Sequence, residues 1–436
     1  LNNCTLSGIN KLTDYRYMKA LRCNLVILNA WPGKEIGENH SKYMVLINAT
    51  LFLLHAFSLA TAILYTRVHS DTLTLYESVH MYYTVFMILV GMVGISILSF
   101  SILIASLFTE FILTSLEVTS TFLNKMHLFY YKDVSEYAMK THKEIHLISH
   151  LFTLYLIGIM VFGHCLFNFI PVWSNYSSGK FKEKILYNST YEHAFYFSVP
   201  LNIYTDFNAY LVGFFYNWVL SYLSASLFCM LDLLLSLIVF NVWGHIKILL
   251  NDLDSFPLPA TEVVIPSDKI NISVNTGMYS EEELKQVSKM LKQCIDYHRL
   301  IVDFTNKMSD AFGPMLLIYY VFHQVSGCLL LFECSQMTAE ALLRYVPLTI
   351  VVFQQLIQLS VIFELIGSTS EKLRDAVYGV PWQYMDTVNR KTVAIFLINV
   401  QEPIHVKALG VVNVGVTSMA AILKTSLSYF TFLRSM

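Results

Sequence analysis

The sequence predicts an all-α integral membrane protein with seven transmembrane helices, a cytoplasmic N-terminus and an extracellular C-terminus. Three observations lead to this prediction. Hydrophobic residues make up 55% of the 436-residue chain, and charged residues make up 14%, against roughly 25% in an ordinary soluble domain. Seven apolar stretches reach the length of about 20 residues that a bilayer requires. Most lysine and arginine residues lie on one side of these stretches.

The apolar stretches cover residues 43–66, 78–106, 148–171, 208–240, 311–335, 343–366 and 411–433. The second and fourth are longer than a bilayer needs, so we expect them to be tilted or to continue as helices into water. The net charge of −2 indicates neither a nucleic acid nor a strongly charged partner. The seven cysteines form no CxxC pair, so we expect no metal site, and no cofactor motif is present.

Basic residues set the expected orientation. The first 42 residues and the segments 107–147, 247–310 and 367–410 hold 22 of the 29 lysine and arginine residues. Since short loops rich in positive charge stay in the cytoplasm, this side is expected to be cytoplasmic. The sequons at Asn175 and Asn188 fall in the loop 172–207, on the opposite side, where glycosylation is expected. A cytoplasmic N-terminus and the lack of DRY-type and NPxxY-type motifs argue against a G-protein-coupled receptor.

The cytoplasmic segments are expected to contain helices of their own. Ser280 and Glu283 form a capping-box pattern, and the apolar residues that follow at intervals of three and four predict an amphipathic helix running into the fifth span. The stretch 110–146 has a similar pattern. Residues 251–279 are rich in proline, serine and aspartate and predict a loosely held loop. These helices suit packing within a subunit or between subunits.

The end of the chain carries polar residues inside an apolar stretch. Residues 393–400 are too short to span, and Pro403 and Gly410 predict a break before the seventh helix. On that helix Asn413, Thr417, Lys424 and Ser428 recur near every fourth position. Such a polar stripe must face protein or water. It either joins helices by hydrogen bonds or lines a water-filled path formed by several copies, and Lys424 favours the path.

The C-terminal 65 or so residues resemble insect odorant receptors. The residues that carry the resemblance are Ala376, Tyr378, Trp382 and Tyr384, then Gln401 and Pro403, and finally Ser428, Tyr429, Phe430 and Thr431. The seven-span layout agrees along the whole chain. The sister family of insect gustatory receptors ends in a Thr-Tyr and Gln-Phe signature, and no Gln-Phe follows Tyr429 here. The chain resembles a ligand-tuned subunit and not the family's co-receptor.

The resemblance implies the odorant-binding subunit of a heteromeric, tetrameric, ligand-gated non-selective cation channel. It implies assembly with a co-receptor subunit and a location in the plasma membrane of olfactory sensory neurons. The implied organisation is a cytoplasmic segment 1–42, six spans with an odorant pocket over 43–366, a cytoplasmic anchor segment 367–410 and a pore helix 411–436. Val414 falls at the family's hydrophobic constriction, with Asn413, Thr417 and Ser418 beside it in the pore.

The resemblance also implies a pocket in the outer half, among the second, third, fourth and sixth spans. Residues sharing a helical face there are Tyr83, Phe86, Met87, Gly158, Phe162, Tyr210, Phe214, Thr349 and Phe353. A pocket of this composition suits a small, nearly neutral, hydrophobic volatile molecule. The same residue types also pack against one another in any membrane bundle.

Three other functions are weighed. A gustatory-type receptor channel would share the layout. A transporter of hydrophobic solutes would show paired interrupted helices at the midplane, and only one interrupted segment is visible. An enzyme would gather its reactive groups, whereas His164, His323, Asp232 and Glu364 are scattered over the spans without catalytic spacing. We therefore expect no enzymatic activity.

Overall fold

The computed structural model describes residues 11–27, 31–33, 43–70, 75–98, 105–181, 190–259, 263–265, 272–274, 278–335 and 339–435. The predicted all-α fold is confirmed. The helices are α1 (Arg16–Ile27), α2 (Tyr43–His69), α3 (Leu75–Leu98), α4 (Ala105–Thr121), α5 (Glu136–Ser177), α6 (Phe207–Asp254), α7 (Glu281–Cys334), α8 (Ala339–Ser370), α9 (Lys372–Gly379), α10 (Thr387–Asn399) and α11 (Val416–Ser435). The short elements are the helical turns Leu12–Asp14, Phe122–Met126, Leu128–Tyr130 and Trp382–Tyr384, and the strands β1 (Val263–Ile265), β2 (Ile272–Val274), β3 (Lys407–Ala408) and β4 (Val412–Asn413).

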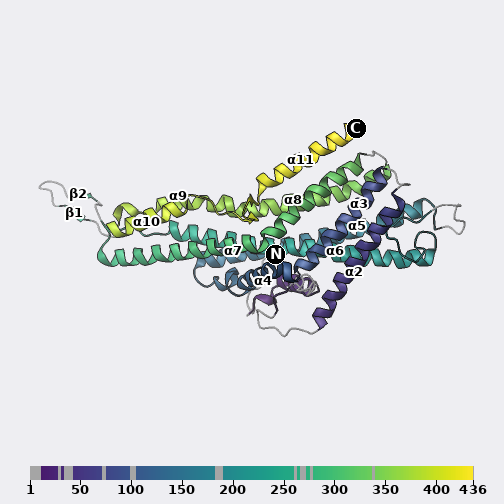
Figure 1. The fold of residues 1–436 in the computed structure, drawn as a ribbon. Helices are drawn as coiled ribbons and strands as arrows, with labels where there is room; N and C mark the ends of the chain where they lie inside the picture. Colours follow the sequence, from purple (N-terminus) through teal and green to yellow (C-terminus); the bar gives the residue numbers. More distant parts are fainter. Residues whose placement is uncertain are drawn as a thin grey trace.

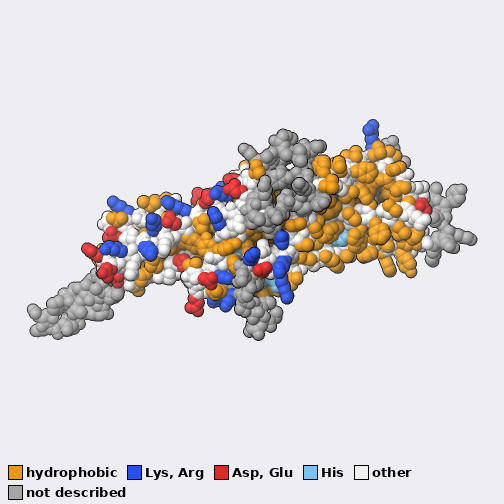
Figure 2. All heavy atoms as spheres, turned by 90° about the horizontal axis from the view of Figure 1, so that it is seen from below, with side chains coloured by type: hydrophobic (Ala, Val, Ile, Leu, Met, Phe, Trp, Pro, Cys, Tyr) orange, Lys and Arg blue, Asp and Glu red, His pale blue; other side chains and the backbone are white. Residues whose placement is uncertain are grey.

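The molecule is elongated, with one apolar half and one charged half (Figures 1 and 2). Apolar side chains cover the half that contains α2, α3 and the adjoining parts of α5, α6 and α8. Lysine, arginine, aspartate and glutamate gather on the other half, where α9 and α10 lie along α7. In the described residues, α2, α5, α6, α7 and α8 are long and apolar enough to cross a membrane. The apolar half therefore has the surface of a protein embedded in lipid.

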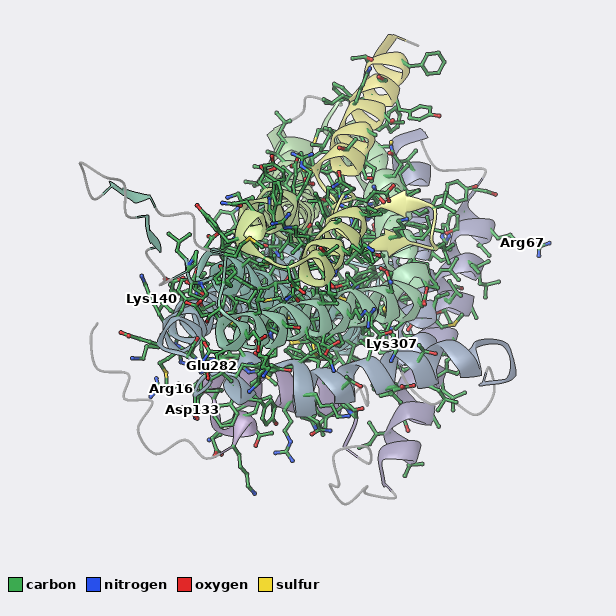
Figure 3. The ribbon with its side chains drawn as sticks, turned by 90° about the vertical axis from the view of Figure 1, so that its left-hand side faces the viewer. Arg16, Arg67, Asp133, Lys140, Glu282 and Lys307 are labelled. Atoms are coloured by element: carbon green, nitrogen blue, oxygen red, sulfur yellow. The ribbon has the colours of Figure 1, made fainter. Side chains whose placement is uncertain are left out.

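Figure 3 looks along the molecule from its charged end and labels six charged side chains. Arg16, Asp133 and Lys140 lie together on one side of the molecule. Arg67, in the last turn of α2, stands apart from them. Long basic side chains at helix ends reach the polar edge of a bilayer, which suits Arg67.

Side-chain caps fix where the longest helices begin. The Ser135 hydroxyl accepts from the amide of Ala138 at 3.0 Å at the start of α5, and the Asp206 carboxylate accepts from that of Ala209 at 3.0 Å at the start of α6. The capping box at the start of α7 is confirmed, since Ser280 and Glu283 each accept from the other's backbone amide. Each cap satisfies amides that lack partners within the helix.

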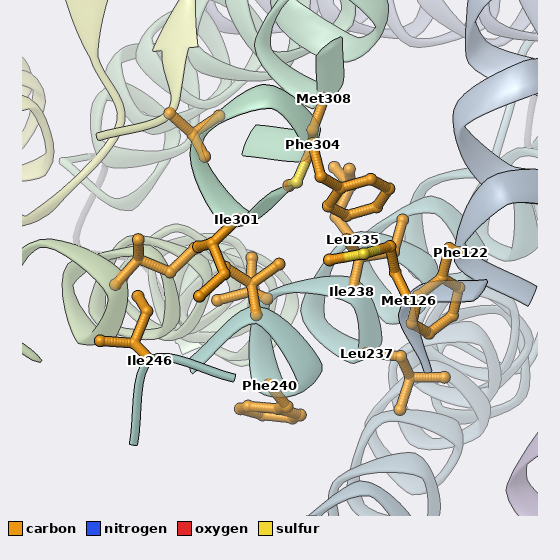
Figure 4. Packing of buried hydrophobic residues seen from close by; sticks show 14 of the residues in the cluster. Phe122, Met126, Leu235, Leu237, Ile238, Phe240, Ile246, Ile301, Phe304 and Met308 are labelled. Atoms are coloured by element: carbon orange, nitrogen blue, oxygen red, sulfur yellow. The ribbon is translucent and has the colours of Figure 1, made fainter. Parts of the chain in front are cut away.

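The core is built around α6. Every residue from 231 to 242 is buried, so this part of the helix is surrounded by protein on all sides. Figure 4 shows α6 between two sets of apolar side chains: Ile301, Phe304 and Met308 of α7 lie on one side of it, and Phe240 of α6 points to the other, where it packs on Phe152 of α5. One continuous core therefore joins the apolar half to the charged half.

The structure departs from the sequence prediction in one connection and leaves another undescribed. The second predicted span, 78–106, is occupied by α3 up to Leu98 and by the start of α4 from Ala105, and residues 99–104 lie outside the described residues. The segment 251–279, expected to be a loose loop, contains an antiparallel pairing of β1 with β2 in which Val263 lies opposite Val274.

The last helix begins later than predicted, and this changes the position of two candidate pore residues. Helix α11 starts at Val416, and the five residues before it belong to the β3–β4 hairpin and its exit. Leu409 and Gly410 have positive φ values of 50° and 70° and form the turn. The β-branched valines that follow favour a strand. Asn413 and Val414 are therefore not on the final helix.

Four histidines form a buried cluster where the N-terminal segment meets α5 and α6. The Tyr17 hydroxyl bonds Nε2 of His127 at 3.0 Å, and the Tyr15 hydroxyl bonds Nε2 of His142 at 3.1 Å. His146, which is half-buried, packs against the rings of Tyr15 and Tyr17. Burial lowers the pKa of each of these three histidines, and a neighbouring histidine lowers each further; the pKa of His142 falls to about 4.

The fourth, His245, is fully buried and hydrogen bonded through both ring nitrogens. Nε2 donates to the carbonyl of Met126 at 2.8 Å, so Nδ1 accepts from the Tyr297 hydroxyl at 2.7 Å. Burial lowers the pKa of His245 to about 4, and the Met126 carbonyl opposes this only in part. A proton on Nδ1 would place a charged ring in this buried site and would reverse the hydrogen bond with Tyr297.

Acidification should therefore destabilise the fold. A histidine with a folded pKa near 4 and an unfolded pKa near 6.5 stabilises the native state above pH 6.5, and this stability is lost as pH falls from 6.5 towards 4. For His245 alone the loss between pH 8 and pH 5 is about 2 kcal/mol. We expect the thermal unfolding midpoint in detergent to fall over this interval, and His245→Gln to flatten the profile. Tyr297→Phe, which keeps the histidine, should retain the slope, and an equally steep profile in His245→Gln would contradict the assignment.

Candidate functional site

A partly open cavity of about 130 Å³ lies in the apolar half, lined by α3, α5, α6, α7 and α8. Its apolar lining consists of Met87, Ile159, Met160, Gly163, Phe167, Phe195, Ala225, Phe228, Phe322, Leu348, Val351 and Val352. Its polar lining consists of Tyr83, His164, Ser221, Ser224, Cys229 and Gln355. A concave, mostly apolar space with a few polar groups is typical of a small-molecule site.

Small residues on facing helices create the space, and aromatic residues wall it. Ser221, Ser224 and Ala225 share one face of α6, opposite Gly163 of α5. Phe228 of α6 stacks on Phe322 of α7, with ring centroids 4.6 Å apart. On the other wall, Phe167 packs against Phe195 at 5.0 Å, and Phe195 comes from the segment that precedes α6. That segment therefore contributes to the site from outside the helices.

One side of the cavity carries a buried polar network. The Asn168 side-chain amide donates to the Ser221 hydroxyl at 2.9 Å and to the backbone carbonyl of His164 at 3.0 Å. Ser221 in turn donates to the carbonyl of Asn217 at 2.7 Å. Nδ1 of His164 lies 3.4 Å from both the Asn168 amide nitrogen and the Ser221 hydroxyl. The network links α5 to α6 beside the cavity.

A second set of polar contacts continues from the cavity along α8. The Gln355 amide donates to Sγ of Cys229 at 3.4 Å, and both residues line the cavity. One turn further, the Gln358 amide donates to the Asp232 carboxylate at 2.8 Å, and Ser236 donates to the same carboxylate at 3.4 Å. A buried carboxylate inside a membrane bundle needs such partners. These bonds fix α8 against α6 below the cavity.

Two of the nine predicted ligand residues line this cavity, namely Tyr83 and Met87. Phe86 is close by, stacked on Phe322 at 6.0 Å. On α5 the predicted face is wrong. Phe162 is 59% exposed on the lipid-facing surface, and a Cβ atom at Gly158 would meet open space, with no neighbouring atom within 4 Å. The adjacent face, with Gly163 and His164, is the one that meets the cavity.

The predicted residues on α6 and α8 also lie elsewhere. Tyr210 and Phe214 are nearer the start of α6 than the cavity-lining residues, where Tyr210 accepts from Asn175 and Phe214 packs on Trp218. Thr349 donates to the carbonyl of Tyr345 at 2.7 Å, and Phe353 packs against Gly327 of α7. The signal that would have located the site is the group of small residues on α6, because such residues leave room between helices.

The predicted glycosylation site at Asn175 conflicts with its environment. Asn175 is fully buried near the end of α5, its amide donates to the carbonyl of Glu192 at 2.9 Å, and its carbonyl accepts from the amide of Glu192 at 2.9 Å. A glycan on this nitrogen is incompatible with these bonds. Asn188 lies outside the described residues.

Of the four predicted pore residues, Val414 is contradicted as a constriction because it is buried within its own chain, 2% exposed. Its amide donates to the carbonyl of Val406. Asn413 and Thr417 are exposed, and Ser418 is half-buried, with its hydroxyl donating to the carbonyl of Asn413 at 2.6 Å. A constriction at this level must be built from other side chains.

Helix α11 packs on α7 and α8 through one face and leaves the opposite face uncovered. Ser426 is fully buried and accepts from the Gln324 amide at 3.1 Å, beside Gly327 of α7. The predicted polar stripe lies on the uncovered face, where Thr417, Lys424 and Ser428 are exposed. In Figure 1 the helix extends away from the bundle towards the C-terminus. The stripe is therefore not sealed within the subunit.

Two contacts fix the start of α11. The Glu364 carboxylate of α8 accepts from the backbone amide of Val416 at 3.1 Å and so caps the helix. The β3–β4 hairpin rests on α7, where a methyl group at Gly313 would lie 2.8 Å from the backbone nitrogen of Leu409. The amide of Lys407 also donates to the Ser309 hydroxyl at 3.1 Å. The position of α11 thus depends on both α7 and α8.

The family model and the curated relatives that match this chain are all odorant receptors. The family model described as 7tm Odorant receptor matches residues 95–427. Odorant receptor 85c of Drosophila melanogaster is 24% identical over 180 residues, which are 41% of this chain and 46% of that protein. Odorant receptor 13a of the same species is 26% identical over 159 residues, which are 33% of this chain and 38% of that protein. The chain thus spans less than half the length of these curated relatives.

The fold is similar to solved structures over nearly the whole chain. The insect olfactory receptor OR5 from Machilis hrabei superimposes with a TM-score of 0.72 at 13% identity, covering 96% of this chain and 97% of that one. The structure of that receptor in complex with eugenol superimposes with a TM-score of 0.70 at 13% identity, covering 95% and 97%.

Proposed function

Because this chain belongs to the 7tm odorant receptor family, we propose that it is the odorant-binding subunit of a heteromeric ligand-gated non-selective cation channel. The family is one of receptors and not of enzymes. The observation that carries the proposal is the mostly apolar cavity among five helices of the apolar half. Its size and aromatic walls suit a small volatile hydrophobic ligand. The neighbouring receptor structure holds eugenol, a molecule of this kind.

We propose that the charged half lies in the cytoplasm and anchors the subunit to its neighbours. On α10, Val388, Ile395 and Ile398 are 61–72% exposed, an apolar surface in a region otherwise surrounded by water. A cavity of about 550 Å³ lies between α10 and α7 beside them. Subunits of a tetramer, including the co-receptor, would cover these residues. The N-terminus is then cytoplasmic and the C-terminus extracellular, as the distribution of basic residues supports.

The pore assignment is revised from Val414 to the exposed side of the hairpin and of α11. Val411, Val412 and Val416 present apolar side chains, 83%, 38% and 36% exposed, next to Asn413 and Thr417. Four copies arranged around an axis would close a ring of valines that excludes water. Further along, Lys424 would face the outer, wider part of the path.

The direct test is electrical recording from cells that express this subunit with an insect odorant co-receptor. Volatile ligands of about five to ten carbons should evoke a cation current that cells with the co-receptor alone do not give. Filling the cavity with Ala225→Phe should reduce the current by at least about tenfold without lowering the amount at the plasma membrane. A surface-expressed complex that responds to no volatile ligand would count against the proposal.

A further inference from the structure

Packed side chains close most of the boundary of the cavity. On one side α3 lies directly on α6, since a Cβ atom at Gly91 would be 3.1 Å from the Ser224 hydroxyl oxygen. Helix α3 is also joined to α8, where the Tyr345 hydroxyl lies 3.3 Å from Nδ1 of His80. Tyr83 and Tyr345 are 8% and 7% exposed. The cavity therefore does not open between α3 and either of these helices.

The segment 190–206 closes the end of the cavity that is remote from the charged half. Phe195 lines the cavity from this segment, and both Phe195 and Phe197 are 2% exposed. The Tyr204 hydroxyl accepts from the Phe197 amide at 2.9 Å and donates to the Phe197 carbonyl at 2.8 Å. The Asn217 side-chain amide donates to the carbonyl of Phe195 at 3.3 Å. A ligand that arrived past this segment would have to displace these hydrogen-bonded groups.

The seam between α5 and α8 is the loosely packed part of the boundary. Two residues of α5 and two of α8 line the cavity and are also partly exposed there: Ile159, Gly163, Leu348 and Val351. The residues of each pair are one helical turn apart, so each pair forms one edge of the seam. Outside its own turn of α5 and among the described residues, a Cβ atom at Gly163 would have one neighbour within 4 Å, Cγ1 of Val351 at 3.8 Å.

The outer side of this seam faces lipid. Phe162 and Ile350, each next to a residue of the seam, are 59% and 62% exposed. Both belong to helices that are long and apolar enough to cross a membrane. Nearer the charged half, the Gln354 amide donates to the Tyr155 hydroxyl and so bridges α8 to α5. Beyond this bridge, the seam is an apolar connection between the surrounding hydrocarbon and the cavity.

We propose that ligands enter and leave the cavity sideways from the bilayer, by passing between Gly163 and Val351. This inference rests on the proposed function and adds the route that its ligand takes. Each methylene group raises the concentration of a molecule in hydrocarbon over that in water about fourfold. Small apolar molecules therefore accumulate in the lipid beside the seam. The route selects hydrophobic ligands before they contact the cavity.

An obstruction in this passage has a kinetic signature of its own. The ligand crosses the same passage inwards and outwards, so an added side chain slows binding and release by the same factor and leaves the affinity unchanged. A side chain that takes up space within the cavity instead lowers the affinity, mainly through faster release. The Cβ position of Gly163 is next to Val351, so a larger residue at Gly163 narrows the passage itself.

The test measures rates and affinity together on the complex with the co-receptor. The volatile probes 1-hexanol, hexyl acetate, 2-heptanone and benzaldehyde are applied and removed by rapid perfusion, at concentrations where the activation rate rises in proportion to concentration. We expect Gly163→Val to slow activation, and decay after removal, at least about fivefold each, with the half-maximal concentration within about twofold of wild type. Gly163→Ala should slow both rates less, and Val351→Ala, which widens the passage, should speed both.

Three control variants separate this route from the alternatives. Gly158→Val, on the same helix but with no atom within 4 Å of its Cβ position, should leave both rates unchanged. Ala225→Val narrows the cavity from α6 and should raise the half-maximal concentration without slowing the two rates equally. Tyr204→Phe removes both hydrogen bonds to Phe197 and should leave the rates within about twofold.

The outcomes distinguish the route from the function. Unchanged rates in Gly163→Val, or a raised half-maximal concentration without slower activation, overturn the inference and leave the proposed function standing. Faster activation and decay in Tyr204→Phe would place the entry at the segment 190–206 and would also overturn it. A complex at the cell surface that responds to none of the four probes, nor to a wider panel of volatile alcohols, esters, ketones and hydrocarbons, overturns both.

Discussion

Replacing Gly313 with valine should reduce ligand-evoked current at least about tenfold in complexes that still reach the plasma membrane. A Cβ atom at this position would lie 2.8 Å from the backbone nitrogen of Leu409 and 3.2 Å from the backbone oxygen of Lys407. Both neighbours are backbone atoms, so no side-chain rotation relieves the clash. The β3–β4 hairpin must move off α7, and α11, which follows it directly, moves with it.

The measurement compares maximal evoked current with surface abundance for three variants. Gly313→Ala should give an intermediate loss, because the clash with Leu409 remains while the valine methyl groups are absent. Gly158→Val is the matched control, since the position on α5 has no atom within 4 Å of a Cβ. It should retain wild-type current. Normal gating in Gly313→Val would show that the hairpin contact does not hold the last helix.

A cysteine at Thr417 should allow nearly complete block of the channel by a charged thiol reagent applied from outside the cell. Thr417 is exposed on the first turn of α11, on the face that the bundle leaves uncovered. If this face lines the conducting path, a permanently charged group fixed there obstructs cations both by its size and by its charge. We expect residual current of roughly a tenth or less after modification.

The matched control is Ser426→Cys on the same helix. Ser426 is fully buried and accepts a hydrogen bond from Gln324, so the reagent should not reach it. The unmodified parent complex must also be insensitive, because Cys165, Cys328 and Cys334 are partly accessible. Equal block at positions 417 and 426, or no block at Thr417→Cys despite labelling of the surface protein, would refute the pore assignment.

The sequence located most helices because membrane spans and helix caps leave direct signals. A run of about 20 apolar residues has few alternatives to a helix in lipid, and α2, α5, α6, α7 and α8 lie where such runs predicted them. The capping box identifies the start of α7 to the residue. The start of α11 is not predictable in this way, because Val411, Val412 and Val414 are equally apolar in a span and in a hairpin. The β-branched side chains beside Gly410 are the available signal.

The cavity-lining faces are harder to predict for a physical reason. In water, the polar side of a helix marks its outer surface, but in lipid both the outer and the inner surface are apolar. On α5, Phe162 faces outwards, whereas the next two residues, Gly163 and His164, line the cavity. An error of one residue in the assigned face therefore selects the wrong side chains. Aromatic residues are common on both sides, so they give no direction. The room left by small residues on α6 depends on three-dimensional packing.

Helix α7 runs without interruption through 54 residues, from the charged half to the far end of the apolar half. At a length of about 80 Å, it connects the charged half, the hairpin contact at Gly313 and the cavity at Phe322 within one helix. Pro314 has no backbone N–H, so one hydrogen bond within α7 is missing at this point. This position is next to Gly313, where the β3–β4 hairpin contacts the helix. We therefore expect a small rotation of the part of α7 beside the cavity to displace the β3–β4 hairpin at this contact, and α11 with it.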